Sequence, residues 1–465
     1  MKRLVTMLLL LALVMSALTV TATAAPEAKS YIVIANGNQL PATLSKQVTA
    51  AGGTITNTIP EIGVAVVSST NASFKAKASN FSGVKSVVPN LRINMVDPVP
   101  AVAYEAVGNP PNSGSADFLF DLQWGHTAVG APAAWEAGYR GAGVRVAVLD
   151  DGIDPNHPDL APNLNVNLST SFVPGEPFEY VPNAPDDVFS HGAHVAGTIA
   201  AAENDFGTIG VAPDAELVMV KVLSSADGEG TWESVTQGII YAASIDADII
   251  NMSLGAELQR RGFCDEDGEC YTARETAEIA NMLGRATTYA YQQGTTVIAS
   301  AGNDAMNSNQ SGDTFHLPSD APHVISISAT GPMGWAVDPE TDLNVPAIYT
   351  NFGLSTIDLA GPGGNLDEAL AESGQVCQVA IAVAPCYVFD FVFSTGFGGW
   401  YWSAGTSMAA PHVSGVAALI IGANGGSMHP AQVESALRSY ALDLGKPGKD
   451  AYFGHGLVYA GSLSE

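Results

Sequence analysis

The chain has 465 residues, and its hydrophobic content of 47% is enough to bury sizeable cores, which excludes wholesale disorder. Its formal net charge of −28 argues against a nucleic-acid partner, because phosphate binding needs a surplus of Lys and Arg. The charge is uneven, since residues 26–100 carry six bases and three acids, whereas the residues after 100 carry ten bases and 43 acids. A mildly basic front therefore precedes a strongly acidic body.

The N-terminus has the pattern of an export signal. Lys2 and Arg3 precede an apolar stretch, and Ala22-Thr23-Ala24 supplies the small-x-small end that a signal peptidase needs. A membrane anchor is the alternative, because the apolar stretch approaches the length of a bilayer span. We favour cleavage. We expect residues 1–25 to be a signal peptide, the protein to be secreted and extracellular, and no transmembrane segment to remain after removal of the signal.

Residues 26–96 are predicted to form a small α+β domain. The expected strands cover 31–35, 62–66 and 84–88, and the expected helices cover 44–51 and 72–79. Residues 97–117 follow, and they are rich in Pro, Ala, Gly and Asn. That composition cannot build a core and predicts an exposed linker.

From about Phe118 the chain alternates buried strands with helices. The strands are apolar runs rich in Val and Ile, as in parallel sheets that helices cover on both faces, and they span 146–149, 217–220, 249–252, 295–299 and 324–328. The expected helices span 193–202, 232–244, 272–292 and 413–421. We therefore expect an α/β fold with a doubly wound, mostly parallel sheet over residues 118–465.

The cysteines form two close pairs in the sequence. Four cysteines allow three connectivities, but nearest-neighbour pairing needs the least ordering of the chain, so we expect two local disulfides, Cys264–Cys270 and Cys377–Cys386. The acidic stretch inside the first pair, residues 265–269, could suit a hard cation such as calcium. A solvated, disulfide-closed loop is the favoured interpretation.

Asp150, His191 and Ser407 each lie at a junction between elements. Asp150 ends the first strand of the body, His191 opens a helix with Ser190 available as its N-cap, and Ser407 follows Gly405 near a helix start. Singly, each has a plain structural explanation as a turn, a packed side chain or a cap. Together they supply what nucleophilic serine chemistry needs, namely a hydroxyl, a general base and a carboxylate that orients the base.

The surrounding segments make the pattern specific. VAVLDDGIDPNHPDL, SHGAHVAGTIA, NMSLG, IASAGN and GTSMAAPHVSGVAAL occur in this order, and over 118–465 the chain resembles the subtilisin-like serine proteases, the subtilases. The resemblance implies a secreted serine endopeptidase that acts on proteins or peptides as a monomer. It makes Ser407 the nucleophile, His191 the general base and then acid, Asp150 the residue that holds the imidazole, and Asn303 the side-chain donor to the oxyanion. Ser253, Leu254 and Gly255 match the segment that pairs with an extended substrate.

The chain also departs from the family pattern. Ala193 stands where the family has Thr in its HGTH motif, so a hydroxyl is missing, although we expect activity to survive. Residues 255–280 and 340–395 look like insertions, and each contains one cysteine pair. Asp159 matches a position that often binds structural calcium in subtilases, with a plain surface acid as the alternative. No cofactor is expected for the chemistry itself.

Residues 26–96 resemble, in layout and position, the ferredoxin-like inhibitor-type propeptide of the same family. That resemblance implies a domain that assists folding, occupies the cleft and is cut off by the enzyme itself within the linker 97–117. The charge asymmetry adds a hypothesis of our own, that the basic propeptide docks on the acidic body partly by charge complementarity.

Other functions explain the residues less well. A catalytically silent binding protein would be expected to have lost one of Asp150, His191, Asn303 and Ser407. A metal hydrolase built on His191 and His194 lacks a matching third ligand, and a lipase-type G-x-S-x-G needs a second Gly where Ala409 stands. The sequence leaves the residue preference and the exact cleavage site open.

Overall fold

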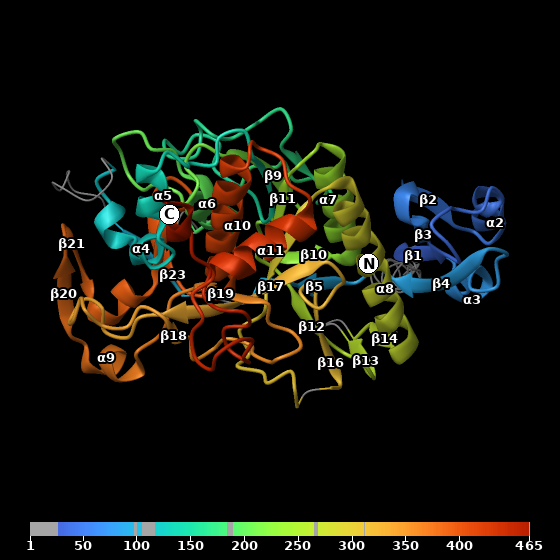
Figure 1. Ribbon diagram of the computed structural model, residues 1–465. Coiled ribbons are helices and arrows are strands. Elements are labelled where there is room, and N and C mark those ends of the chain that lie inside the picture. Colours follow the sequence, from blue (N-terminus) through green and yellow to red (C-terminus); the bar gives the residue numbers. More distant parts are fainter. Residues whose placement is uncertain are drawn as a thin grey trace, which may run out of the picture.

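The computed structural model describes residues 27–96, 100–104, 117–183, 189–264, 268–310 and 312–464. The predicted signal peptide, most of the predicted linker and the acidic residues 265–267 lie outside these ranges. Two parts stand out in Figure 1, a small N-terminal unit and a larger body, and the N-terminal unit lies beside helix α8 (Ala273–Gln293) of the body.

The body is built on an eight-stranded sheet in the order β18-β17-β15-β11-β7-β9-β8, with β19 paired to β17. All of its ladders are parallel except β17–β18. The strands are β7 (Arg145–Asp150), β8 (Thr170–Ser171), β9 (Glu216–Lys221), β11 (Ile249–Met252), β15 (Thr296–Ser300), β17 (Val324–Gly331), β18 (Val345–Pro346) and β19 (Leu359–Pro362). The five strands predicted from sequence occupy five adjacent positions, β17 to β9.

Helices cover both faces of this sheet (Figure 1). Val146 and Val148 of β7 pack into one core with α6 (His191–Ala200) and α10 (Thr406–Ala423). The alternate residues of β7, Ala147 and Leu149, pack into a second core with α7 (Trp232–Ser244) and α8. Because successive side chains of a strand point to opposite faces, this division confirms the predicted doubly wound α/β fold.

Helix α10 runs through the middle of the body. Within the described ranges it is the one helix whose length and composition would allow it to cross a membrane, with a mean hydropathy of 1.3 over 18 residues. Of that window, 89% is buried inside the protein. The apolar character of α10 is therefore that of a core helix.

The N-terminal unit has the order β1 (Lys29–Ala35), α2 (Leu44–Ala50), β2 (Thr54–Ile59), β3 (Val64–Ser69), α3 (Phe74–Ala78) and β4 (Val84–Pro89). Its strands form an antiparallel sheet in the order β2-β3-β1-β4, which is the ferredoxin-like arrangement. Strand β2 was not predicted, because its sequence TITNTI offers polar residues and only two isoleucines instead of an apolar run. The polar strand is held by its pairing with β3.

Shorter elements complete the body. Both predicted disulfides are present and confirm local pairing, Cys264–Cys270 across the β13–β14 hairpin and Cys377–Cys386 beside the β20–β21 hairpin. The short strands are β5 (Arg92–Asn94), β6 (Ala101–Tyr104), β10 (Glu229–Thr231), β12 (Ala256–Gln259), β13 (Gly262–Cys264), β14 (Cys270–Thr272), β16 (Thr314–Leu317), β20 (Val376–Val379), β21 (Ala382–Pro385), β22 (Val392–Thr395) and β23 (Trp400–Ser403). The remaining helices are α4 (Trp124–Ala128), α5 (Ala131–Glu136), α9 (Glu368–Ser373) and α11 (Pro430–Tyr440), with short 3-10 turns at 60–62, 120–122, 386–390 and 461–464.

The segment predicted as an exposed linker differs from that expectation in one place. Ala101–Tyr104 forms strand β6, which pairs antiparallel with β23 of the body. The composition of this segment does not predict a strand, because the hydrogen bonds come from a partner strand some 300 residues further along the chain.

Candidate functional site

Three predicted site segments meet at one edge of the sheet. Asp150 is the last residue of β7, Ser253 follows β11, and Asn303 lies just after β15. These strands are neighbours in the order β15-β11-β7 and run parallel, so their carboxyl ends emerge side by side. Polar side chains at this edge of an open α/β sheet are where function is expected.

Asp150 and His191 are in direct contact. His191 Nδ1 lies 2.9 and 3.1 Å from the two carboxylate oxygens of Asp150, and both residues are buried. A ring nitrogen that faces a carboxylate carries the proton, so Nε2 is the basic nitrogen of the neutral ring. The approach depends on Gly192, where a Cβ would collide with the carbonyl oxygen of Gly152.

Asp151 holds the start of helix α6 in place. Its carboxylate accepts the backbone N–H groups of His191 at 3.2 Å and Gly192 at 2.8 Å, two donors that have no partner within the helix. Ser190 caps the same turn by accepting the N–H of Ala193, as the sequence predicted. Burial and the neighbouring Asp150 carboxylate raise the pKa of Asp151. The sequence alone gives Asp151 no role beyond its place beside Asp150 in the segment VAVLDDGID.

Ser407 lies in the first turn of α10 and is linked to Ser253 by two hydrogen bonds. The Ser407 hydroxyl donates to the Ser253 carbonyl at 3.1 Å, and the Ser253 hydroxyl donates to the Ser407 carbonyl at 2.7 Å. Pro411 has no N–H to offer the carbonyl four residues before it, so the Ser253 hydroxyl supplies a donor that the helix lacks at this position. Pro411 therefore frees the Ser407 carbonyl to fix the start of α10 against the end of β11.

Asn303 is oriented by Thr406, the residue before Ser407. Its side-chain oxygen accepts the Thr406 N–H at 2.8 Å and the Thr406 hydroxyl at 2.9 Å. With the oxygen fully used, the amide Nδ2 remains as the donor of this side chain. Thr406 was not singled out from sequence, and its only signal there is its position directly before Ser407.

The segment Ser253–Gly255, predicted to pair with substrate, contacts the chain's own N-terminal part. Gly255 N–H donates to the Met95 carbonyl at 2.8 Å, and Met95 N–H donates to the Gly228 carbonyl at 3.4 Å. Just before Met95, β5 pairs antiparallel with β10. The residues around Met95 thus run as an extended strand between two segments of the body, as an extended peptide would.

His316 is a further residue beside this segment that the sequence did not indicate. A Cβ at Gly255 or at Gly302 would collide with its imidazole, so the ring lies between the segment that contacts Met95 and the turn that carries Asn303. His316 Nδ1 lies 2.8 Å from the Ser319 hydroxyl, and burial lowers the pKa of His316 to about 4. Nothing in the local sequence TFHL marks this position, since it is defined by two glycines distant in the chain.

His194 and Asp159 have surroundings that differ from those of His191 and Asp150. His194 Nε2 lies 3.1 Å from the Tyr401 carbonyl and must donate to it, and burial lowers the pKa of His194 to about 3. His194 is therefore a neutral residue that ties α6 to β23. Asp159 Oδ2 accepts Thr208 N–H at 2.8 Å, the Thr208 hydroxyl at 2.9 Å and the Trp400 indole N–H at 2.8 Å.

Two buried side-chain oxygens at this place, one of them on Asp159 itself, have no hydrogen-bond donor among the described residues. They are Asp159 Oδ1 and Asn204 Oδ1, and Asn204 Nδ2 donates to the carbonyl of Pro158 next to Asp159. Burial raises the pKa of Asp159 to about 6. Bare, buried oxygen acceptors fit a hard cation, which prefers oxygen ligands.

Comparisons with known proteins agree with this geometry. The sequence model of the Subtilase family matches residues 141–456, a range that contains Asp150, His191, Asn303 and Ser407. The chain belongs to the subtilase family. It is 35% identical to subtilisin NAT of Bacillus subtilis subsp. natto over 347 residues, which is 74% of this chain and 71% of that protein. It is also 35% identical to a subtilisin of Bacillus pumilus over 342 residues, which is 72% of this chain and 96% of that protein.

Solved structures extend the likeness to nearly the whole chain. The epidermin leader peptide processing serine protease of Staphylococcus aureus superposes with a TM-score of 0.72, covering 94% of this chain and 98% of that one. Its 22% identity shows the shared fold alone. As a subtilase, the protein is a serine-type endopeptidase, a hydrolase that acts on protein or peptide substrates.

Proposed function

We propose that this subtilase is a secreted enzyme that cleaves peptide bonds through Ser407, His191 and Asp150 and is made as a self-processing precursor. The observation that carries the triad is the contact of His191 Nδ1 with both oxygens of Asp150, deep in the protein. This contact fixes the tautomer and would stabilise the imidazolium that forms when Nε2 takes a proton. Ser407 lies in the first turn of α10, which packs against α6, the helix that His191 opens.

The proposed reaction begins when the Ser407 hydroxyl turns from the Ser253 carbonyl toward His191 Nε2. Ser407 Oγ attacks the peptide carbonyl and its proton passes to His191. The oxyanion that forms is met by Asn303 Nδ2 and by the Ser407 N–H, which has no partner within the helix at this position. Collapse expels the amine with a proton from His191 and leaves an acyl-enzyme, which water hydrolyses by the same path. No cofactor takes part in these steps.

The test of this function is covalent labelling. We expect a fluorophosphonate to abolish hydrolysis of casein by the mature enzyme and to add its mass to the peptide that contains Ser407. The adduct should form on Ser407 and not on Ser414, which lies on the same helix but donates its hydroxyl to Asn251 at 2.8 Å. Full activity after stoichiometric labelling, or labelling at another serine, would contradict the proposal.

Export and processing rest on separate features. Residues 1–25 have the composition of a signal peptide, and the two disulfides are typical of proteins that mature in an oxidising compartment. We propose that the N-terminal unit, residues 27–96, is a propeptide that assists folding and inhibits the enzyme until it is removed. The extended path of the chain around Met95 supports this role, because it occupies the segment at which a substrate would bind.

The contact between the N-terminal unit and the body combines apolar and charged groups. Ile32 and Ile34 of β1 join one apolar cluster with Ile279 and Met282 of α8, whereas the alternate residues of β1 pack on the unit's own helices. Among the described residues, this face of the small sheet is therefore covered by the body. Four of the six bases counted in residues 26–100 form ion pairs with the body, Lys29 with Glu269, Lys75 with Glu275, Lys85 with Glu278, and Arg92 with Asp227 and Glu229.

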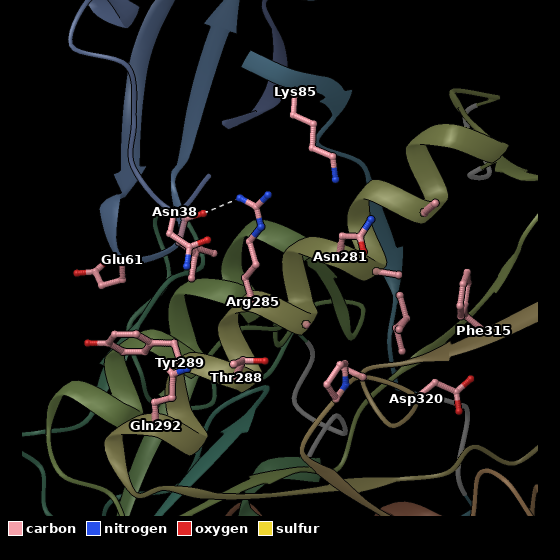
Figure 2. A pocket seen from close by; sticks show the side chains of 17 residues that line it. Asn38, Glu61, Lys85, Asn281, Arg285, Thr288, Tyr289, Gln292, Phe315 and Asp320 are labelled. Carbon is pink, nitrogen blue, oxygen red and sulfur yellow. Dashed lines mark hydrogen bonds between the residues drawn. The ribbon is translucent and has the colours of Figure 1, made fainter. Parts of the chain in front are cut away.

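An open cleft of about 590 Å³ interrupts this contact (Figure 2). Lys85 and Arg285 both line it, and the Arg285 guanidinium donates to the carbonyls of Ala35, Gly37 and Ile62. Water and salt therefore reach Lys85 and Arg285 at this interface. Charge pairs that are open to solvent are screened at a Debye length of about 10 Å in 0.1 M salt.

Inhibition by the N-terminal unit should therefore depend on salt. We expect residues 27–96, added to mature enzyme, to inhibit it with an inhibition constant that rises about tenfold between roughly 0.05 and 0.5 M NaCl. Lys85→Gln should weaken inhibition about two- to fivefold at low salt. Lys46→Gln is the matched control, because Lys46 is exposed on α2. Inhibition that does not change with salt would rule out the role of charge complementarity.

We further propose that Asp159 and Asn204 contribute to a structural calcium site. The folded pKa of Asp159, about 6, lies above the usual value, so between pH 4 and 6 the folded protein binds a proton that the unfolded chain releases. The free energy of unfolding therefore falls as pH rises through this range, and above pH 6 a buried carboxylate is charged. A cation would offset that cost.

The calcium proposal predicts a pH-dependent stabilisation. We expect saturating calcium to raise Tm by about 5–10 °C at pH 8 and by much less at pH 5. Asp159→Asn should remove the response. Asp390→Asn should keep it, because Asp390 is also a buried carboxylate with a pKa of about 6, but its two oxygens accept the N–H groups of Gly334 and Trp335. Equal calcium responses in wild type and Asp159→Asn would contradict the site.

A further inference from the structure

Strand β23 is paired on both of its edges. β22 lies on one side, and β6 lies on the other, with Val102 opposite Trp402 and Ala103 opposite Tyr401. All four residues of β23 are buried. A strand of this kind, if β6 left, would present a bare hydrogen-bonding edge beside two tryptophans.

The side chains of β6 fit this position. Val102 is half-buried and packs into an apolar cluster with Trp402, Phe391 and Phe393, whereas Ala101 and Ala103 are exposed. That alternation is the pattern of an edge strand with one face on a core. β6 is thus a packed strand of the body, although it lies in sequence between the N-terminal unit and the rest of the chain.

The chain after β6 also belongs to the body. Asp117 is fully buried and accepts the N–H groups of Asn204 and Phe206 at 3.0 and 3.1 Å. Phe118 and Leu119 join the same apolar cluster as Val102. The described residues on both sides of 105–116 are therefore anchored to one part of the body.

The chain before β6 behaves differently. Arg92–Asn94 continues the N-terminal unit as β5, and Met95 follows it between Gly228 and Gly255. Ser253, two residues before Gly255, is joined to Ser407 by two hydrogen bonds. Met95 thus lies near the segment that contacts the proposed nucleophile, and by Ala101 the chain is part of the body.

We propose that Ala101–Tyr104 stays in the mature enzyme as the third strand of the β22-β23-β6 sheet, and that the maturation cut therefore falls on the N-terminal side of Ala101. This inference rests on the proposed self-processing. Each cut consumes one water and leaves a carboxylate on the N-terminal piece and an amine on the body. The new N-terminus is then held by strand addition to β23, a binding mode in which backbone pairing supplies the attachment.

The retained strand has a consequence for the site. The Tyr401 carbonyl of β23 accepts a hydrogen bond from His194 of α6, and His191 is the first residue of that helix. β6 therefore covers the outer edge of the strand on which α6 rests. Loss of β6 should loosen α6 as well as the apolar cluster around Trp402.

The test is the N-terminus of the active, mature enzyme, determined by intact mass and N-terminal sequencing after expression of the full chain. We expect the mature chain to begin at or before Ala101. An active enzyme that begins after Ala101 would overturn the proposal. Failure of the wild-type chain to mature, or equal processing of Ser407→Ala, would instead contradict the self-processing on which it rests, so the two failures are distinguishable.

Paired variants test the packing of β6 itself. In the mature enzyme, Val102→Asp should lower Tm by about 3–6 °C, because it buries a charge against the aromatic cluster, whereas Ala103→Asp should change Tm by less than about 1 °C. Where Val102→Asp fails to accumulate, Val102→Ala should still lower Tm by about 2 °C. Equal Tm values for the Val102 and Ala103 variants would overturn the proposed strand.

Discussion

Ser407→Ala should lower kcat for casein or peptide hydrolysis by about 10⁶-fold, the loss measured when the nucleophile of subtilisin is removed. The physical reason is that the substitution removes the proposed nucleophile that forms the acyl-enzyme, whereas the proposed substrate segment Ser253–Gly255 is untouched, so KM should stay nearly unchanged. The same substitution should leave the N-terminal unit covalently attached. Intact mass of the purified chain and steady-state kinetics check both expectations.

The substitution should do little to the fold. Ala fits the first turn of α10, and the Ser253 hydroxyl still donates to the backbone carbonyl of residue 407. Only the bond from the Ser407 hydroxyl to the Ser253 carbonyl is lost. Ser439→Ala is the matched control, because Ser439 is an exposed helix serine of α11 that bonds only within its own helix. A Ser407→Ala chain that still matures at the wild-type rate would contradict the proposed nucleophile.

The parts of the fold that could be predicted are those whose signal is local. Strands such as β7 and β11 are buried on both faces, so their apolar runs stand out, and α7 has the same bounds in the structure as in the prediction. Strand β2 escaped prediction because mostly polar residues form it, and β6 because small residues form it and a distant partner strand supplies its hydrogen bonds. Local composition carries no record of such a partner.

The candidate site likewise contains residues with a local sequence signal and residues whose roles depend on distant contacts. Asp150, His191 and Ser407 could be selected because each lies at an element junction inside a recognisable motif. The residues that position them could not, because their roles depend on contacts across the fold. Thr406 matters through Asn303, a hundred residues away, and His316 through the two glycines that flank its ring. Lys221 is wholly buried and donates to the Asp151 backbone carbonyl at 2.5 Å, a contact that its strand sequence does not suggest.

Asn303→Ala should lower kcat by about 10²–10³-fold with KM nearly unchanged, which is the effect known for the corresponding donor of subtilisin. Asn303 Nδ2 is proposed to donate only to the oxyanion, which exists in the transition state and not in the bound substrate. A residue that merely supported the fold would lower stability, or raise KM together with a loss of kcat. The split between kcat and KM, measured with a soluble peptide substrate, therefore identifies its role.

Two further variants separate the donor from its setting. Asn303→Asp keeps the size of the side chain and can still accept from the Thr406 N–H and hydroxyl, but it replaces the Nδ2 donor by a negative oxygen. It should therefore lose at least as much kcat as Asn303→Ala while Tm stays within about 2 °C of wild type. Thr406→Val removes one of the two donors that orient Asn303 and leaves the backbone N–H, so its kcat should fall only severalfold. If Asn303→Asp retained wild-type kcat, the charge of the side chain would be irrelevant to the reaction and Asn303 could not be the oxyanion donor. A loss of kcat that is largest for Asn303→Asp, smaller for Asn303→Ala and smallest for Thr406→Val would instead support a different conclusion. Catalysis would then depend first on the Nδ2 donor and second on its orientation by Thr406.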